Sequence, residues 1–232
     1  MRIFVGTSGW SYTWNAGNNL RWYVEHSGLN TVELNSSFYR FPFPSYIKSW
    51  LKWGKKLRWS IKVNRLITHI YRFNKKSYST WEKFSNLFKP MESLIDFFLF
   101  QLPPRFGPGS LEQLQFFLHT VNLGNKAAVE FRNPSWFDKR FIDWAKEIGI
   151  TWVSVDSPEL PREIYRTSDC VYLRMHGRTE WYNHNYTVRE LKKVAEKISN
   201  GGAKNCYIYF NNNHHMLDNA QRMRETLQGL TI

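Results

Sequence analysis

Short strand-like segments recur along the chain, and most of them alternate between apolar and polar residues. In Leu57–Asn64 every odd position is apolar and every even position is polar or charged. A period of two places the two kinds of side chain on opposite faces of a β-strand. The segments predicted as strands are Arg2–Val5, Thr31–Asn35, Leu57–Asn64, Asp96–Gln101, Lys126–Arg132, Ile150–Asp156, Val171–His176 and Cys206–Asn211.

Helical segments separate nearly all of these strands. They are predicted at Asn18–Ser27, Ser45–Trp53, Ser77–Phe88, Leu111–Thr120, Ser135–Ile148, Thr187–Ile198 and Leu217–Leu227, with a short, weak helix after Pro158. Strict β-then-α order implies a parallel sheet, and eight such units favour a closed barrel. The predicted fold is therefore an α/β protein with a TIM-like (β/α)8 barrel, a single domain over residues 1–232. The alternative is a doubly wound sheet, but Gly6–Trp10 lacks the spaced glycines of a dinucleotide-binding loop.

The alternation also predicts which side chains point into the barrel. Working residues of parallel barrels lie at the carboxyl ends of the strands. The positions expected to face the helices are apolar: Val32, Leu34, Ile61, Val63, Val129, Phe131, Val153, Val155, Leu173, Met175, Ile208 and Phe210. The positions expected to face inward are polar: Glu33, Asn35, Lys62, Asn64, Gln101, Glu130, Arg132, Asp156, Arg174, His176 and Asn211. So many converging polar groups are unfavourable to bury unless they pair with one another or bind a ligand.

Two chemical interpretations of this inward set stay open. In the first, carboxylates and His176 bind a divalent metal ion that activates water, while cations hold phosphate oxygens. In the second there is no metal, a Glu or His acts as general base, and Arg and Lys bind an anionic small molecule. The chain contains no HExxH motif and no close pair of ligands, so the cofactor stays open. The candidate catalytic residues are Glu33, Lys62, Glu130, Asp156 and His176.

An aromatic loop follows the seventh predicted strand. Gly177 ends that strand, and Trp181 and Tyr182 lie in the loop. A strand that ends in Arg-x-His before such a loop is typical of the rim of a binding site, although an edge strand with a solvated face is the alternative. The candidate substrate-binding residues are Asn35, Tyr39, Asn64, Gln101, Arg132, Arg174, Trp181, Tyr182 and Asn211.

The charge of the chain changes the expected partner. The formal net charge is +13, which favours nucleic acid, although a basic proteome or a solubility effect would also produce it. Cys170 and Cys206 have no metal-ligand spacing, so a reducing, cytoplasmic location is expected. No apolar run reaches membrane-spanning length, and no signal peptide is expected at the N-terminus.

Seven motifs resemble one protein family over essentially the whole chain. They are GTSGWSY from Gly6, VELNSSFYR from Val32, LITHI from Leu66, FQLPPRF from Phe100, VEFRNPSWF from Val129, YLRMHGR from Tyr172 and YFNNN from Tyr209. In this order they resemble the uncharacterised DUF72 family, also called the YecE-like family. The resemblance implies a TIM-barrel-like fold with a polar cleft and brings no settled activity. An analogy with endonuclease IV-type barrels implies DNA binding.

The chain departs from the family pattern after the last strand. The motif usually ends in Asp, where this chain has Asn213, and the Gly-Tyr-Ala that usually follows is replaced around His215. If that Asp binds a metal in relatives, this chain lacks the ligand, or His214 or His215 takes its place.

Three functions follow from these observations. The first is a hydrolase acting on nucleic acid, a phosphodiesterase or nuclease that uses a divalent metal under the first interpretation. The second is an enzyme acting on a small anionic metabolite such as a sugar phosphate. The third is a non-catalytic protein that binds single-stranded nucleic acid by aromatic stacking and phosphate contacts. The oligomeric state is not predicted.

Overall fold

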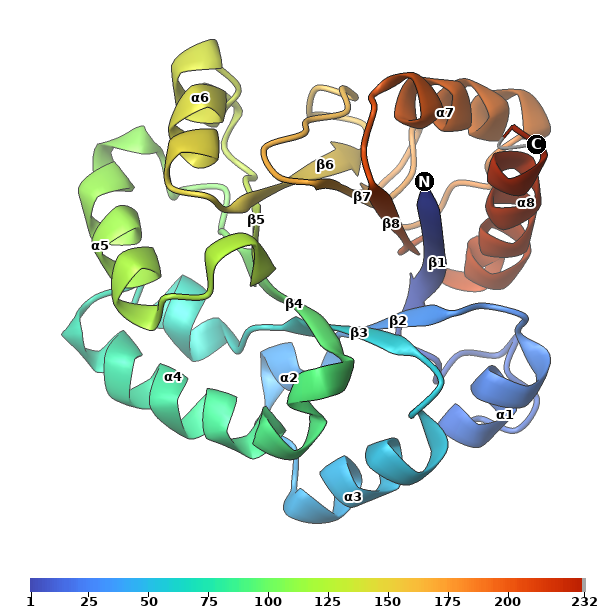
Figure 1. The fold of residues 1–232 in the computed structure, drawn as a ribbon, viewed down its shortest axis with the longest axis horizontal. Coiled ribbons are helices and arrows are strands. Elements are labelled where there is room, and N and C mark those ends of the chain that lie inside the picture. The colour runs from blue at the N-terminus through green and yellow to red at the C-terminus, as the bar shows by residue number, and fades with distance from the viewer. Residues whose placement is uncertain (231–232) are drawn as a thin grey trace.

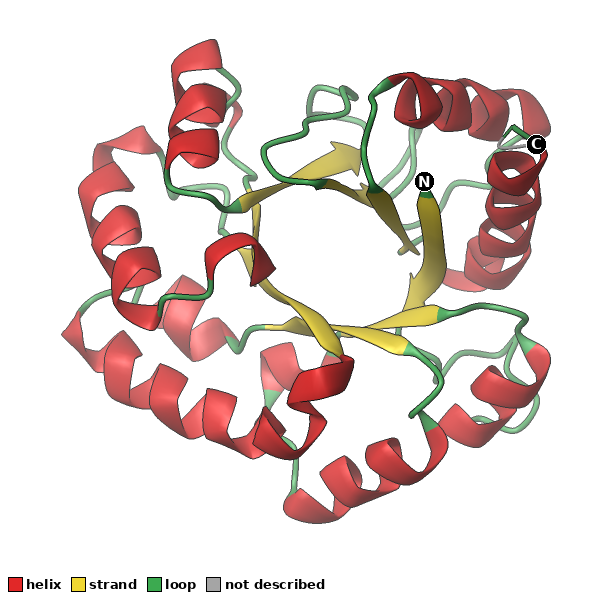
Figure 2. Ribbon diagram, in the orientation of Figure 1, coloured by secondary structure: helices red, strands yellow, loops and turns green. Residues whose placement is uncertain are grey.

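A closed ring of parallel strands forms the centre of the molecule (Figures 1 and 2). The computed structural model describes residues 1–230. Each strand pairs with the next in chain order, and β8 closes the ring against β1. The strands are β1 (Arg2–Ser8), β2 (Thr31–Leu34), β3 (Arg58–Lys62), β4 (Ile95–Gln101), β5 (Ala127–Glu130), β6 (Thr151–Asp156), β7 (Cys170–Met175) and β8 (Asn205–Phe210). The predicted TIM-like (β/α)8 barrel is confirmed.

Helices surround the strands on the outside of the ring (Figure 1). The α-helices are α1 (Leu20–His26), α2 (Ser36–Tyr39), α3 (Pro44–Trp53), α4 (Lys75–Phe88), α5 (Leu111–Val121), α6 (Lys139–Glu147), α7 (Val188–Asn200) and α8 (Met216–Gly229). A π-helical turn covers Leu66–Ile70, and 3-10 turns cover Lys89–Leu94, Pro108–Ser110, Gly124–Lys126, Pro134–Trp136 and Asn213–His215. The predicted start of α7 is confirmed, because Thr187 and Glu190 form a reciprocal capping box.

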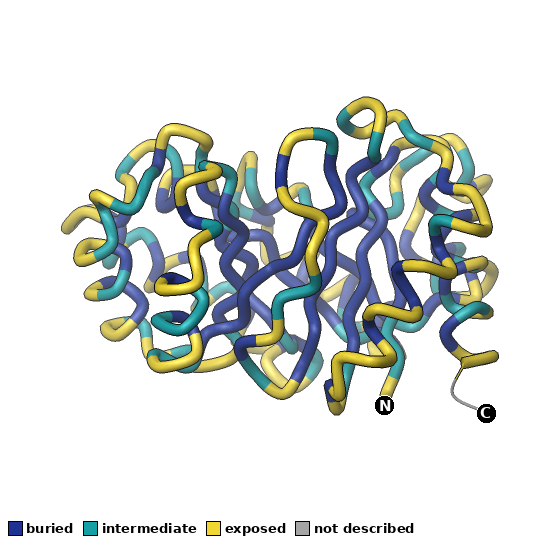
Figure 3. The backbone as a smooth tube through the Cα atoms, turned by 90° about the horizontal axis from the view of Figure 1, so that it is seen from above, coloured by how far each residue is buried: buried dark blue, intermediate teal, exposed yellow. Residues whose placement is uncertain are grey.

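Two apolar cores lie on the two faces of the barrel wall. The larger core fills the space between strands and helices, and the smaller one lies inside the ring around Phe97, Leu99, Tyr172 and Tyr209. The strands are buried along almost their whole length, whereas exposed positions lie on the helices and loops (Figure 3). Burial on both faces is usual for parallel strands, because helices cover the outer face.

The sixth strand reverses one predicted orientation. Val153 and Val155 belong to the inner core rather than to the outer one. Paired residues of parallel strands point to the same side, and Val155 pairs with Arg174 whereas Asp156 pairs with Met175. The prediction that Asp156 faces the barrel interior is therefore wrong. The physical reason is Trp152, which packs outward against Phe131 with ring centroids 4.1 Å apart and so sets the parity of β6.

Two predicted helical features differ from the structure. The connection from Ser157 to Asp169 contains no helix, so the weak helix after Pro158 is wrong. It is an irregular segment tied to β6, in which the Tyr165 amide donates to the Ser154 hydroxyl over 2.8 Å. The predicted N-cap at Ser135 is also wrong, because α6 begins after Asp138, whose carboxylate accepts from the Arg140 amide.

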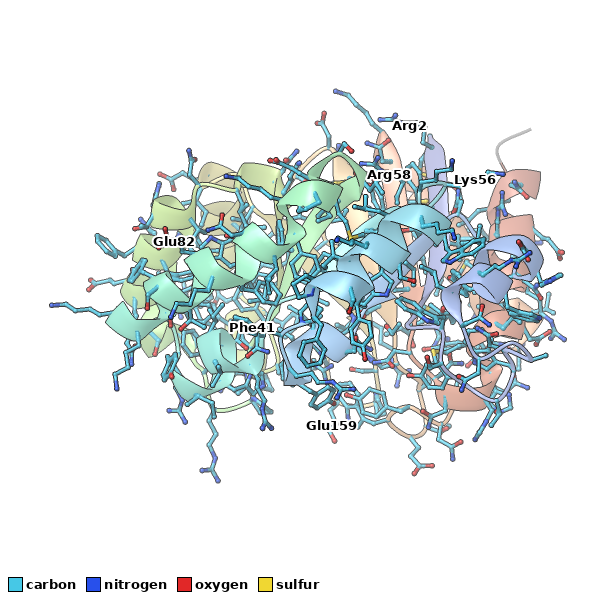
Figure 4. The ribbon with its side chains drawn as sticks, turned by 90° about the horizontal axis from the view of Figure 1, so that it is seen from below. Arg2, Phe41, Lys56, Arg58, Glu82 and Glu159 are labelled. Carbon is cyan, nitrogen blue, oxygen red and sulfur yellow. The ribbon has the colours of Figure 1, made fainter. Side chains whose placement is uncertain are left out.

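The two ends of the barrel are easily told apart. Arg2, Lys56 and Arg58 lie at one edge of the molecule, where strands begin, and Glu159 lies at the opposite edge, after β6 (Figure 4). The candidate site lies at the edge where strands end. None of the helices in residues 1–230 combines the length and hydropathy of a bilayer-spanning segment.

Candidate active site at the barrel mouth

A buried arginine links two carboxylates from opposite parts of the ring. Arg174, near the end of β7, donates to Glu33 of β2 over 2.6 Å and to Glu130 of β5 over 2.5 Å. All three side chains are fully buried. Burial alone would lower the pKa of Arg174, but the two carboxylates raise it, so the guanidinium stays charged. These residues from separate segments therefore meet inside the barrel, as the alternation predicts.

Hydroxyl groups complete the coordination of Glu33. The Ser8 hydroxyl donates to one carboxylate oxygen over 2.6 Å, and the Tyr172 hydroxyl donates to the other over 2.7 Å. Tyr172 in turn lies 2.7 Å from the Ser60 hydroxyl. Each Glu33 oxygen thus has at least one partner within the protein, so this carboxylate has its hydrogen-bond needs met without a ligand.

A second arginine connects Glu130 to the rim. Arg132 bonds Glu130 through Nε, and its Nη2 lies 3.2 Å from Nε2 of His176. Its guanidinium also stacks over the Trp181 ring, 4.4 Å from the ring centre. Burial would raise the pKa of Glu130, but Arg132 and Arg174 hold it well below its usual range. Glu130 is therefore an ionised carboxylate that is shared between two arginines.

His176 is buried and uncharged at neutral pH. Burial, followed by the charges of Arg132 and Arg174, lowers its pKa from 6.5 to about 3. Because arginine only donates, Nε2 of the neutral ring accepts from Arg132, and Nδ1 lies 3.3 Å from the Asn211 amide group. The ring is thus held in a fixed orientation beneath the rim.

Among the three cations of the mouth, Lys62 differs from Arg132 and Arg174 in forming no ion pair with a carboxylate of residues 1–230. Its side chain ends β3 on the inner face, in register with Leu99, and only 8% of the residue is exposed. Within residues 1–230 its amine makes no ion pair or hydrogen bond; it lies over the Phe38 ring, 4.3 Å from the centre. Burial, and then Arg174, lowers the pKa of Lys62 to about 7, against the weaker opposite effect of Glu130 and Glu33. A substantial fraction of this amine is therefore uncharged at neutral pH.

Two residues beside the buried network, His69 and Tyr12, were not among the predicted site residues. His69, in the π-helical turn, packs edge-on against Phe38 with ring centroids 5.0 Å apart. Burial and the charge of Lys62 lower the pKa of His69 to about 4. Tyr12, in the loop after β1, donates to the Ser8 carbonyl over 3.3 Å, and burial and Glu33 raise its pKa. Both residues lie in motifs that carry the family resemblance, GTSGWSY and LITHI. Membership of these motifs was the sequence feature that could have pointed to them as site residues.

The aromatic loop after β7 folds back over His176. The Tyr182 amide donates to the His176 carbonyl over 2.7 Å, and the Trp181 and Tyr182 rings lie 5.4 and 5.5 Å from the imidazole. Gly177 makes this return with φ +118°, and an added Cβ there would lie 2.4 Å from the Glu180 carbonyl oxygen. The loop thus forms one wall of the mouth.

The remaining predicted substrate-binding residues differ in burial and in whether their amides are already hydrogen-bonded within the protein. Asn64 is buried, and its amide is used internally, donating to the Ser37 carbonyl and accepting from the Leu66 amide. Gln101 pairs in register with Glu130 on the inner face. Asn35 leaves a buried amide oxygen without a partner, and Tyr39 is 68% exposed on α2. Asn35 and Gln101 are therefore the predicted amides that remain available to a ligand.

Asp156 takes part in a separate ion pair outside the ring. Arg178 donates to both of its oxygens at 2.7–3.0 Å, and the Tyr186 hydroxyl donates to one over 3.0 Å. The neighbouring hollow, between β6, β7 and α7, contains Lys193 and Lys197. Asp156 thus supports the start of the aromatic loop from the outer side, and the structure does not bring it to the predicted catalytic group.

The residues at the mouth do not fit a metal centre. Across residues 1–230, no three His, Cys, Asp or Glu side chains are grouped so that they could hold an ion. Glu33 and Glu130 are both occupied by arginines, and His214 bonds Thr13 instead, with Nδ1 2.9 Å from the hydroxyl. The described part of the mouth therefore offers no set of free ligands for a divalent metal.

Comparison with known proteins identifies the family. The family model described as "Protein of unknown function DUF72" matches residues 4–231. The chain belongs to this family. No curated protein matches the chain.

Two solved DUF72 proteins are similar to this chain throughout. One, from Thermotoga maritima, is 26% identical with a TM-score of 0.83, and the match covers 98% of this chain and all of the other. One from Enterococcus faecalis V583 is 25% identical with a TM-score of 0.82, and the match covers 98% of each chain. A methyltransferase from Methanosarcina mazei, 12% identical with a TM-score of 0.54 over 99% of this chain and 95% of the other, shares the fold alone.

The position at which this DUF72 chain departs from the expected pattern lies outside the network. Asn213 is exposed and has φ +52°, a left-handed conformation that asparagine adopts more readily than most residues. It begins the 3-10 turn before α8. Asn213 thus has a conformational reason to be asparagine.

Proposed function

We propose that the barrel mouth is the active site of an enzyme acting on a small anionic metabolite, such as a phosphorylated one. The observation that supports this most strongly is the state of Lys62, a nearly buried amine without a carboxylate partner in residues 1–230. Perturbed lysines in concave polar sites are typical of catalysis or anion binding.

The local charge balance gives the physical reason. Glu33 and Glu130 carry two negative charges, and Arg132 and Arg174 carry two positive charges, so this network is neutral without Lys62. Charging Lys62 then leaves one buried positive charge, which is unfavourable in a low-dielectric site. A bound anion would compensate it. Lys62 therefore binds the anion when protonated and serves as a general base when neutral.

The surrounding groups suit a small ligand. Arg132 presents its guanidinium at the rim beneath Trp181, and Asn35 offers an unpaired amide oxygen. Neutral His69 packs edge-on against Phe38, the ring over which the lysine lies. These groups supply a cation, a hydrogen-bond acceptor and a neutral imidazole within one mouth, which is a usual set for proton transfer on an anionic substrate.

A hydrolase acting on nucleic acid is the second candidate, and the net charge of +13 favours it. The five charged groups of the mouth contribute at most one unit of that excess, so most of it lies elsewhere. Phosphodiester hydrolysis with a metal also requires free carboxylates, and the two at the mouth are bonded to arginines. The charge supports polyanion binding by the surface more than chemistry in the mouth.

A thermal-shift screen tests the first proposal. We expect phosphorylated metabolites to raise the Tm by roughly 5–10 °C at a hundredfold excess over Kd, and Lys62→Met to abolish the shift. Lys139→Met is the matched control, since Lys139 lies on the surface paired with Asp143. Shifts that are equal in both variants, or no shift with any anion in a broad library, would contradict the proposal.

Labelled DNA and RNA test the second candidate. Incubation with Mg²⁺, Mn²⁺, Zn²⁺ or chelator yields no cleavage if the mouth acts on small metabolites. Metal-dependent cleavage that is lost in Glu130→Gln would favour the hydrolase instead. Retention of nucleic acid that weakens steeply with salt, without cleavage, would indicate a binding surface alone.

A further inference from the structure

The amine of Lys62 meets the structural conditions for covalent chemistry. It lies at the carboxyl end of a barrel strand, on the inner face, with almost all of the side chain buried. Some surface lysines are instead paired with carboxylates, such as Lys139 with Asp143 at 2.5 Å and Lys204 with Asp169 at 2.7 Å. A primary amine becomes a nucleophile when burial removes its proton and no acid holds it charged.

The ring of Phe38 covers one side of the Lys62 amine and leaves no polar partner on that side. The aromatic face lies 4.3 Å from Nζ on one side, and His69 packs against the edge of the same ring. On the barrel side the nearby charges belong to the paired carboxylates and arginines, whose hydrogen bonds are directed at one another. The nitrogen is therefore held in place by packing, and residues 1–230 supply it with no hydrogen-bond partner. In the neutral amine the lone pair is thus available.

We infer that Lys62 forms an imine with an aldehyde or ketone group of an anionic substrate. This inference rests on the proposed function and names its substrate class, an anionic carbonyl compound. The anionic part of the ligand lies against Arg132 at the rim, and the carbonyl carbon reaches Nζ deeper in the mouth. Simple anions without a carbonyl group bind without reacting.

The covalent step balances without a further reagent. The ammonium form of Lys62 gives up one proton, and the free amine attacks the carbonyl carbon to form a C–N bond. Transfer of a second nitrogen proton to the oxygen yields a carbinolamine. The first proton then returns to the hydroxyl group, which leaves as water, and the C=N bond of a protonated imine forms. The carrier of that proton is solvent water or the neutral imidazole of His69, which packs against the same Phe38 ring.

The fraction of free amine explains why one lysine would react first. At pH 7 a substantial fraction of Lys62 is uncharged, whereas an ordinary lysine is uncharged in fewer than about one molecule in a thousand. Near neutral pH the reaction should therefore be selective, and the selectivity should fall as the pH rises toward 10, where the surface lysines also lose their protons.

Reductive trapping with sodium cyanoborohydride tests the inference on the full chain. Pyridoxal 5′-phosphate serves as the anionic aldehyde, pyridoxal as its uncharged counterpart, and formaldehyde as a minimal probe. We expect peptide mass spectrometry at pH 7 to find Lys62 labelled at least tenfold faster than Lys139 by formaldehyde and by the phosphate ester, and more slowly by pyridoxal. Lys62→Met should lose the fast labelling, and Lys139→Met should keep it.

Two results would overturn the inference. One is formaldehyde labelling of Lys62 no faster than that of Lys139, which would show an ordinary amine. The other is fast formaldehyde labelling without any adduct from the phosphate ester, which would show that the site does not take an anionic carbonyl compound. Failure here is separable from failure of the proposed function, because thermal shifts with phosphorylated ligands that lack a carbonyl group test binding alone.

Discussion

At the scale of single residues, the mouth combines a balanced network with one unbalanced lysine. Arg174 is enclosed by carboxylates and satisfies both, whereas Lys62 lies against an aromatic ring. A buried ion-pair network such as that of Arg174 fixes the positions of its side chains. A buried, unpaired amine such as that of Lys62 destabilises the folded state unless it binds a ligand. Three predictions follow from this contrast.

Replacing Lys62 by methionine should stabilise the protein. The folded-state pKa of about 7 lies below the unfolded value of 10.5, so the unfolded chain binds more protons between these values. The free energy of unfolding of the wild type therefore rises with pH in this window. We expect Lys62→Met to gain up to about 4 kcal/mol at pH 7, because each unit between the two pKa values corresponds to about 1.4 kcal/mol, and the gain to shrink toward pH 10. Denaturant unfolding at both pH values measures it; a loss of stability at pH 7 would contradict it.

Acid should weaken the fold through His176. Its folded pKa of about 3 lies below the ordinary 6.5, so between these values the unfolded chain takes up a proton that the folded chain does not. Stability is then lost as the pH falls, by about 1.4 kcal/mol per pH unit for one proton. His176→Gln should remove that part of the slope between pH 6 and 4. An unchanged slope would show that this histidine is protonated in the folded protein.

Removing the guanidinium of Arg174 should lower the free energy of unfolding far more than removing a surface cation. Arg174→Met leaves two buried carboxylates with one of their cations missing, and breaking a buried pair from one side costs roughly 3–5 kcal/mol. The surface pair of Lys139 and Asp143 provides the control, since Lys139→Met should change stability by less than about 0.5 kcal/mol. Chemical denaturation of both variants gives the comparison, and equal effects would contradict the network.

At the scale of elements, the loop after β7 links the fold to the site. Gly177 lets the chain turn so that Trp181 covers Arg132. Gly177→Ala places a Cβ 2.4 Å from the Glu180 carbonyl oxygen at a positive φ, so the loop must shift. We expect weaker binding of anionic ligands, by about tenfold or more, with the barrel retained. Gly109→Ala is the control, because an added Cβ there meets no atom within 4 Å. Unchanged affinity in Gly177→Ala would show that the loop is not a wall of the site.

The alternation of side chains along a strand predicts the inner face correctly in β3 and β7 and wrongly in β6. In β3 and β7 one face is apolar and the other polar, so alternation placed Lys62 and Arg174 correctly on the inner face. In β6 the valines Val153 and Val155 face the barrel interior, and the other face carries two polar residues beside Trp152. The size of Trp152, rather than polarity, decides which face meets the helices. Asp156 was misplaced for that reason.

Tyr12 and His69 could not be predicted as site residues for a different reason. Tyr12 and His69 lie in a loop and in a π-helical turn, where no periodicity tells which way a side chain points. The same limit applies to Asn64, whose amide is consumed by the turn that begins at Leu66. Local hydrogen bonding decides such positions, and residue spacing alone does not determine it.

At the scale of the whole molecule, the barrel confines the chemistry to one end. Eight parallel strands bring residues more than a hundred positions apart into one network, as with Glu33 and Arg174. The order of strands and helices was sufficient to predict this architecture, because right-handed β-then-α units close in few other ways. The excess of positive charge is a property of the molecular surface, and the mouth itself is nearly neutral.

The protonation of Lys62 in the intact protein decides whether the barrel mouth contains a buried amine that responds to anions. Its amine can be followed by NMR after isotope labelling of the lysines, with Lys62→Met used to assign the signal. We expect a titration midpoint near pH 7 that rises when phosphate or a phosphorylated metabolite binds. An amine that titrates above pH 10 and does not respond to any anion would contradict it.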